Sequence, residues 1–188
     1  EFMNTPNKLT IARIIVSFLI IILLLFPFNR VGIEFYSFHI KSIWINLKYI
    51  IAGVLFILAS ITDFLDGYIA RKYGLITNTG KMLDAIADKV LVNGVLIVLA
   101  VEGYISVVVP VVIVSRDIFV DSIKMVAGQK SGAVGASKAG KFKTAFMLVG
   151  ITLLFFYDLP FSLANIYPAK AIIMIATVLS VISGIQYY

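Results

Sequence analysis

The chain has 188 residues, of which 61% are hydrophobic and 14% charged, whereas soluble domains are roughly half apolar and a quarter charged. This composition excludes a soluble globular protein and predicts a single membrane domain. We place that domain at residues 3–188, because Glu1 and Phe2 before Met3 are typical of a cloning scar. The lack of cysteine and the single His39 exclude a zinc centre, and a net charge of +6 is expected to serve topology and anionic lipids rather than nucleic acid.

Apolar stretches recur along the chain, each close to the roughly 20 residues that cross a bilayer as a helix. We therefore predict an all-α fold, a polytopic membrane bundle of six transmembrane helices near residues 8–28, 48–72, 80–102, 104–127, 139–158 and 163–186. The first stretch is expected to remain as a helix, because no small-residue cleavage site follows it. Residues 29–46 mix aromatic and charged side chains, which predicts an interfacial anchoring segment.

Basic residues are unevenly distributed between the ends of the predicted helices. If the N-terminus lies in the cytoplasm, that side collects most of them, and the opposite side keeps Arg30, Lys41, Lys48 and Lys170. This asymmetry follows the positive-inside rule. It predicts a multi-pass protein of the cell membrane, in which the end of the second helix and the start of the third face the cytoplasm.

Acidic residues gather where the second predicted helix ends and the third begins. Asp63 and Asp66 are three residues apart, and Asp84 and Asp88 are four apart, so each pair lies on one helix face. A short connection makes these helices antiparallel neighbours, which predicts that the four carboxylates converge. Each charge costs about 2.5 to 3.5 kcal/mol at membrane depth, so a compensating cation is required. An all-oxygen site suits Mg²⁺ or Mn²⁺. The alternative is a salt-bridge network with Arg71, Lys81 and Lys89.

Small residues accompany these acids on the same two helices. Gly67 and Gly80 each cost roughly 1 kcal/mol relative to alanine inside a helix. Without side chains they allow a phosphate or a base to approach the backbone, and Ala70 keeps the same face shallow. The alternative is that they are small residues at contacts between membrane helices.

The motif D-x2-D-G-x2-A-R-x8-G-x3-D-x3-D, running from Asp63 to Asp88, resembles the signature of the CDP-alcohol phosphotransferases at every fixed position. The chain length and the predicted helices also resemble that family. The resemblance implies a homodimer and a two-ion site, with Mg²⁺ or Mn²⁺ held by the four aspartates, and it implies that Asp88 also acts as the base. It further implies a CDP-lipid pocket that includes Asp66, Gly67, Ala70, Arg71 and Gly80.

The opening stretch from Asn4 to Arg13 is similar to that of bacterial phosphatidylglycerophosphate synthases. This likeness implies that Asn7, Thr10 and Arg13 position the substrate, with Asn7 and Thr10 in the CDP-lipid site, while the alternative is helix capping by a polar N-terminus. It also implies transfer of a phosphatidyl group from CDP-diacylglycerol to glycerol 3-phosphate. Inositol phosphate, serine or phosphatidylglycerol are alternative acceptors. From other classes, the alternatives are a cation transporter and a non-catalytic scaffold.

A second polar set lies on the fourth and fifth predicted helices. Arg116 is deepest in its helix, and Lys138 and Lys141 open the next one. Because arginine binds phosphate bidentately and lysine adds a point charge, we predict that these residues bind the phosphate of the acceptor. The alternative for Arg116 is an ion pair with Asp117. For Lys143, in the same set, a phosphate contact and a position facing lipid headgroups are both open.

Overall fold

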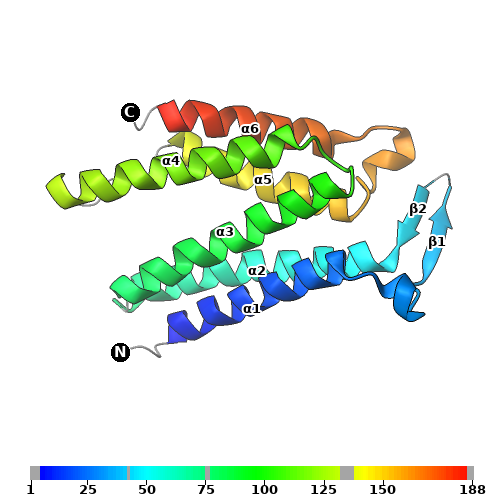
Figure 1. The fold of residues 1–188 in the computed structure, drawn as a ribbon, viewed down its shortest axis with the longest axis horizontal. Helices are drawn as coiled ribbons and strands as arrows, with labels where there is room; N and C mark the ends of the chain where they lie inside the picture. Colours follow the sequence, from blue (N-terminus) through cyan, green and yellow to red (C-terminus); the bar gives the residue numbers. More distant parts are fainter. Residues whose placement is uncertain (1–4, 42, 75–76, 132–137, 186–188) are drawn as a thin grey trace. The chain divides into compact units, whose positions relative to one another are not determined.

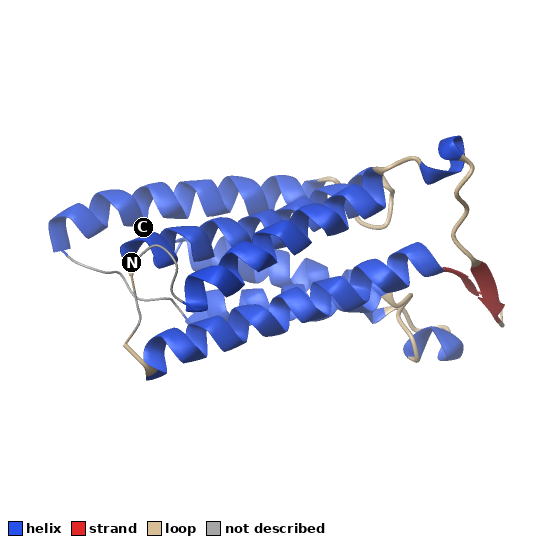
Figure 2. Cartoon of the chain, turned by 90° about the horizontal axis from the view of Figure 1, so that it is seen from below, coloured by secondary structure: helices blue, strands red, loops and turns tan. Residues whose placement is uncertain are grey.

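The computed structural model of the chain describes residues 5–41, 43–74, 77–131 and 138–185. These residues form helices joined by short turns and by one small β-hairpin (Figures 1 and 2). The helices are α1 (Thr5–Leu25), α2 (Leu47–Lys72), α3 (Asn78–Val101), α4 (Val108–Ser131), α5 (Lys138–Phe155) and α6 (Pro168–Ile185). The all-α prediction is confirmed, and each predicted helix is present near its expected position.

The chain divides into two compact units. Unit 1 comprises Glu1–Val98 and Phe155–Tyr157, and unit 2 comprises Leu99–Leu154 and Asp158–Tyr188. In unit 1, α1 packs along α2, and a hydrogen bond from Arg13 on α1 to Asp84 on α3 joins these two helices. In unit 2, α4 packs against α6. The single domain over residues 3–188 stays a prediction.

Within the described residues, three helices are long and apolar enough to cross a membrane by length and composition. The qualifying stretches are Asn7–Leu25, Leu47–Ala70 and Pro168–Ile185. Large apolar side chains such as Phe18, Ile22 and Leu58 are exposed on these helices, as expected of surfaces that lipid covers. The other three helices carry most of the charged residues discussed below. A membrane protein is therefore supported, and six spans remain a prediction.

Local signals account for where the helices of unit 1 begin and end. The first helix ends at Leu25, earlier than predicted, because Pro27 cannot donate to the helix and disfavours helical geometry before it. At the start of α2, the Asn46 side chain accepts the backbone N–H of Lys48 at 2.9 Å. At the start of α3, the Thr77 hydroxyl accepts the N–H of Gly80 at 2.9 Å. Both are N-caps of the ordinary kind.

The segment between α1 and α2 contains structure that the sequence did not predict. A 3-10 turn, η1 (Phe28–Val31), leads to the antiparallel strands β1 (Ser37–Ile40) and β2 (Ile43–Asn46). His39 and Trp44 pair across the strands with ring centroids 3.6 Å apart, while Ile45 points the other way and is buried. Trp44 is exposed, consistent with the predicted interfacial role.

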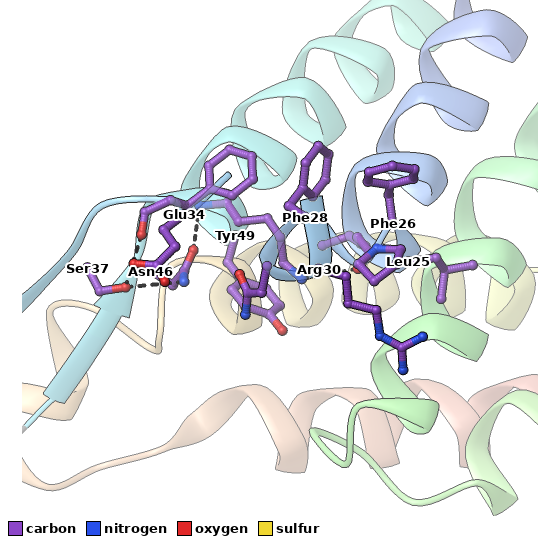
Figure 3. A pocket seen from close by; sticks show the side chains of 13 residues that line it. Leu25, Phe26, Phe28, Arg30, Glu34, Ser37, Asn46 and Tyr49 are labelled. Atoms are coloured by element: carbon purple, nitrogen blue, oxygen red, sulfur yellow. Dashed lines mark hydrogen bonds between the residues drawn. The ribbon is translucent and has the colours of Figure 1, made fainter. Parts of the chain in front are cut away.

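A cavity of about 590 Å³ lies between this segment and the adjoining ends of α1 and α2 (Figure 3). Its wall includes Phe28, Arg30, Glu34 and Tyr49, and a hydrogen bond of 3.2 Å joins Asn46 to Ser37 beside it. The cavity is open and lies at the opposite end of α1 and α2 from the predicted aspartate site.

The start of α6 is fixed by a carboxylate from the preceding segment. Asp158 is buried and accepts the backbone N–H of Ala169 at 2.7 Å. Between them lie η2 (Phe161–Ala164) and Asn165, whose left-handed backbone ends that turn. The sixth helix therefore begins at Pro168, later than predicted, since proline is favoured in the first turn.

We expect Asp158→Ala to lower the free energy of unfolding by about 1 to 3 kcal/mol, because Ala169 loses its acceptor in a buried position. Asp158→Asn keeps an acceptor oxygen and should stay close to wild type. Thermal unfolding in detergent measures both variants. Equal losses for the alanine and the asparagine variant would contradict a hydrogen-bonding role.

Comparison of wild type with Asp158→Asn also tests how the protonation of Asp158 affects stability. Burial raises the pKa of Asp158 above 3.8, so the folded protein binds the proton more tightly than the unfolded chain. The stabilising contribution of this group is thus fully present below pH 3.8 and is lost as the pH rises through the folded pKa. Wild type should therefore gain stability relative to Asp158→Asn as the pH falls from above the folded pKa to below 3.8.

Candidate active site

Three buried polar side chains line one face of the mainly apolar helix α1. Asn7, Thr10 and Arg13 are spaced by three residues, so they lie above one another on the helix. They are only 2%, 4% and 1% exposed. A buried arginine in an apolar helix needs partners, and these come from α2 and α3.

The structure brings together three of the four predicted aspartates. One carboxylate oxygen from each of Asp63, Asp66 and Asp84 lies within 4.8 Å of the other two. The side chain of Asp66 is 5% exposed, while those of Asp63 and Asp84 are 45% and 54% exposed. The cluster therefore has a buried floor at Asp66 and an accessible side at the other two acids.

The guanidinium of Arg13 contacts all three carboxylates. Its Nη2 donates to Asp66 at 2.8 Å and to Asp84 at 2.6 Å, and its Nη1 donates to Asp63. Thr10 also donates its hydroxyl proton to Asp66, at 3.1 Å. The salt-bridge alternative named Arg71, Lys81 and Lys89 as partners and stays open, while among the described residues Arg13 on α1 pairs with all three acids.

The fourth predicted aspartate, Asp88, lies one helical turn beyond Asp84 on α3. It is exposed and does not belong to the group of three whose oxygens come together. Its predicted roles as fourth ligand and as base stay predictions. The side chains of Arg71 and Lys138 lie outside the described part of the structure.

Small residues border the cluster on both motif helices. Gly67 and Ala70 are half-buried on α2. A Cβ added at Gly80 would lie 2.7 Å from Oδ1 of Asn7 and 3.0 Å from the hydroxyl of Thr77. Gly80 on α3 therefore lies close to the Asn7 side chain of α1, and the packing alternative stays open. A role for these residues in the CDP-lipid pocket stays a prediction.

The cluster is chemically suited to a divalent cation. Its ligand atoms are all carboxylate oxygens, the type that Mg²⁺ and Mn²⁺ prefer. Three carboxylates against one guanidinium leave two negative charges uncompensated, which one divalent ion would neutralise. The exposed oxygens of Asp63 and Asp84 give such an ion a route of entry.

In unit 2, Arg116 has a dense set of intramolecular partners. It donates from Nε to the carbonyl of Ser180 at 3.0 Å, from Nη1 to Asp117 at 2.9 Å and from Nη2 to the Ser183 hydroxyl at 2.8 Å. Lys143 also pairs with Asp117, at 3.0 Å. The predicted alternative, an ion pair with Asp117, is therefore present. Phosphate binding by Arg116 and by the exposed Lys141 stays a prediction.

The sequence analysis identified these two networks only in part. Arg13 was identified through the resemblance of the opening stretch, although an arginine inside an apolar helix by itself indicates a buried partner. Ser180, Ser183 and Gly184 on α6 were not singled out. A Cβ at Gly184 would lie 3.2 Å from Cγ of Arg116, so this glycine gives the arginine stem room. The three-residue spacing of the two serines was the available signal.

Apolar helices that enclose a group of ionisable side chains define a membrane protein with a polar functional centre. The chain belongs to the CDP-alcohol phosphatidyltransferase family, whose model matches residues 3–182. It is 35% identical over 185 residues to the CDP-diacylglycerol–glycerol-3-phosphate 3-phosphatidyltransferase of Bacillus subtilis (strain 168), in a match that covers 98% of this chain and 93% of that relative.

Other relatives carry the same name. The protein of Rickettsia typhi (strain ATCC VR-144 / Wilmington) is 34% identical over 186 residues, or 98% of this chain and 95% of that protein. The protein of Mycoplasma genitalium (strain ATCC 33530 / DSM 19775 / NCTC 10195 / G37) is 40% identical over 146 residues, or 77% of this chain and 61% of that relative. The family expected from the aspartate motif is confirmed.

Proposed function

We propose that this chain transfers the phosphatidyl group of CDP-diacylglycerol to glycerol 3-phosphate, releasing CMP and forming phosphatidylglycerol phosphate. The observation that carries this proposal is the convergence of the motif aspartates Asp63, Asp66 and Asp84 on two neighbouring helices of a family member. Relatives matched over nearly their whole length bear the name of this activity. Family membership favours a transferase over a cation transporter or a scaffold.

The proposed reaction is a displacement at phosphorus. A hydroxyl oxygen of the acceptor forms a bond to the phosphorus that carries diacylglycerol, and the bond from that phosphorus to the bridging oxygen of the pyrophosphate breaks. The hydroxyl proton goes to Asp88 in this proposal, and CMP leaves with the bridging oxygen. Because a phosphate monoester has a second pKa of about 6, CMP leaves without a strong acid.

The residues around the aspartates have separate tasks in this scheme. When bound, Mg²⁺ or Mn²⁺, as a pair of ions, would supply charge neutralisation at the reacting phosphates. Asp63, Asp66, Asp84 and Asp88 would hold these ions. We assign the CDP-lipid pocket to a further set that borders this cluster in sequence or space, namely Asn7, Thr10, Gly67, Ala70, Arg71 and Gly80.

The aspartate ends of α2 and α3 are proposed to lie at the cytoplasmic side of a protein with six membrane spans. The distribution of lysine and arginine supports this orientation. That orientation would put the acids where water-soluble glycerol 3-phosphate is present. A homodimer in contact with membrane lipids is expected from the family resemblance.

Purified protein in nanodiscs, supplied with CDP-diacylglycerol and one acceptor at a time, tests the proposed function. The acceptors are glycerol 3-phosphate, glycerol, inositol phosphate, serine and phosphatidylglycerol. Among these acceptors, we expect only glycerol 3-phosphate to give CMP release and a phosphatidylglycerol phosphate product, which mass spectrometry identifies. Faster transfer to inositol phosphate or serine would change the acceptor assignment. No CMP release with any acceptor would remove the transferase proposal.

Truncation of Arg116 should expose both a structural and an acceptor role. Arg116→Ala removes the hydrogen bonds to Ser180, Ser183 and Asp117, so the free energy of unfolding should fall by about 1 to 3 kcal/mol. If Arg116 also binds the acceptor phosphate, the KM for glycerol 3-phosphate rises by about tenfold or more, while the KM for CDP-diacylglycerol changes far less.

Ser183→Ala is the matched control for that experiment, because it removes one partner of Arg116 and keeps the guanidinium. It should lower stability without raising the KM for glycerol 3-phosphate. Equal kinetics for Arg116→Ala and wild type, measured at a temperature where both are folded, would restrict Arg116 to the structural role. A rise in the donor KM alone would move it to the nucleotide side.

A further inference from the structure

Arg13 is placed to act on the metal centre rather than only on the substrate. Its side chain is 1% exposed, and its two terminal nitrogens contact Asp63, Asp66 and Asp84. Its Nε is buried and has no hydrogen-bond partner among the described residues. A permanent cation is therefore built into the same group of oxygens that suits a divalent ion.

A guanidinium and a metal ion compete for such oxygens. Arginine stays protonated at every accessible pH, so its charge cannot be removed when a metal ion arrives. The carboxylates of Asp66 and Asp84, which accept hydrogen bonds from Nη2, are also ligands that a divalent ion would need. A divalent ion bound to these carboxylates would lie close to the guanidinium, and two neighbouring positive charges repel strongly where water is scarce. A metal ion that binds these oxygens therefore weakens the hydrogen bonds that Arg13 donates to them.

We propose that Arg13 is an internal counter-cation that weakens divalent-metal binding at the aspartate cluster, and that the metal displaces it from Asp63 and Asp84 but not from Asp66. This inference rests on the proposed function. Asp63 and Asp84 are about half exposed and can exchange partners, whereas Asp66 is buried and is held by Thr10 as well. The arginine thus stays anchored at the floor of the cluster.

Competition between Arg13 and the metal ion affects how the metal and the donor bind. A cluster that already contains one cation holds a divalent ion weakly until more negative charge arrives. The pyrophosphate of the donor brings such charge. Metal and donor should therefore bind cooperatively, and by linkage each raises the affinity for the other by the same factor. Without Arg13, the acids would bind the metal tightly alone and the cooperativity would shrink.

Direct Mn²⁺ binding to the purified full chain, measured by electron paramagnetic resonance without substrate, tests this inference. Arg13→Gln should lower the Kd for Mn²⁺ by at least roughly tenfold, since a unit positive charge beside the ion is removed. Lys8→Gln is the matched control, because it removes one exposed charge from the same helix. It should leave the Kd unchanged. An unchanged or higher Kd in Arg13→Gln would overturn the proposal, since Arg13 would then hold the acids in place for the metal.

Thermal unfolding provides a second readout. In chelator, Arg13→Gln should unfold at a lower temperature than wild type, because three acids lose their partner. Saturating Mn²⁺ should close most of that gap, and a gap that persists unchanged would count against displacement. If Arg13→Gln does not fold, Arg13→Lys replaces it. Its single ammonium reaches fewer carboxylates, so the Kd for Mn²⁺ should fall by about threefold or more, and an unchanged or higher Kd overturns the proposal.

Failure of this inference is distinct from failure of the proposed function. Wild type that transfers the phosphatidyl group but binds Mn²⁺ no more weakly than Arg13→Gln overturns only the role of Arg13. Wild type that shows the Arg13 effect on Mn²⁺ binding but releases no CMP overturns only the transferase proposal.

Discussion

Exhaustive chelation is expected to abolish phosphatidyl transfer by this chain, and added Mg²⁺ or Mn²⁺ should restore it. The aspartate cluster keeps two uncompensated negative charges even with Arg13 in place. A donor pyrophosphate adds negative charge at the same position in the proposed reaction. Without a divalent ion, mutual repulsion excludes the donor and leaves the reacting phosphate unstabilised. Metal ions contribute several kcal/mol to such reactions, so the rate should fall by at least about a hundredfold.

The measurement is CMP release by protein dialysed against chelator, with metal content determined by elemental analysis. Mg²⁺, Mn²⁺ and Zn²⁺ are then added back separately. Zn²⁺ should restore less activity, because it prefers nitrogen and sulfur ligands and the cluster offers only oxygens. Protein dialysed without chelator serves as the control. Full activity with no bound metal would remove the metal role of Asp63, Asp66 and Asp84.

The helices could be predicted because long apolar runs have few alternatives in a membrane protein. The errors at their ends come from local signals that were not weighed. Pro27 stops α1 early, and Pro168 together with the Asp158 cap starts α6 late. The hairpin of β1 and β2 was missed because each strand has only four residues and no strong alternation of apolar and polar side chains.

The aspartate cluster could be predicted only in part. Spacing places Asp63 and Asp66 on one face of α2, but it does not say which part of α1 packs there. The partnership of Arg13 with these acids joins residues 50 or more positions apart. Such pairings depend on the packing of α1 against α2, which periodicity within a single helix does not specify. The position of Asp88 outside the group of three likewise depends on how α3 crosses its neighbours.

The contrast between Arg13 and Arg116 illustrates the same limit. Both are arginines in helices, with Arg13 buried and Arg116 partly buried, and sequence reasoning gave both a substrate role. The structure places Arg13 among acids, and its Nε has no hydrogen-bond partner within the described part of the chain, whereas Arg116 donates to a carbonyl, a hydroxyl and a carboxylate. Arg116 therefore has the partners of a residue that ties α4 to α6. The partners of Arg13 are the three aspartates that are proposed to bind a metal ion.

Asp63→Asn and Asp88→Asn are expected to lose activity for different reasons. In the proposed reaction, Asp63 is a metal ligand with an accessible carboxylate, so its loss chiefly weakens metal binding. Asp88 is the proposed base, so its loss slows proton removal, typically by about 10² to 10⁴-fold. Raised Mg²⁺ should therefore restore much of the rate of Asp63→Asn and little of the rate of Asp88→Asn.

Initial rates of CMP release over a range of Mg²⁺ concentrations separate the two variants, and Mn²⁺ binding without substrate gives an independent check. Asp63→Asn should need a higher Mg²⁺ concentration for half-maximal rate, while Asp88→Asn should show a lower maximum. Unfolding temperatures in chelator control for structural damage, because Asp63 also pairs with Arg13. Equal rescue of both variants by Mg²⁺ would make Asp88 an ordinary ligand. The base would then have to be sought among the other acids of the cluster or on the acceptor itself, whose phosphate stands near its own hydroxyl groups.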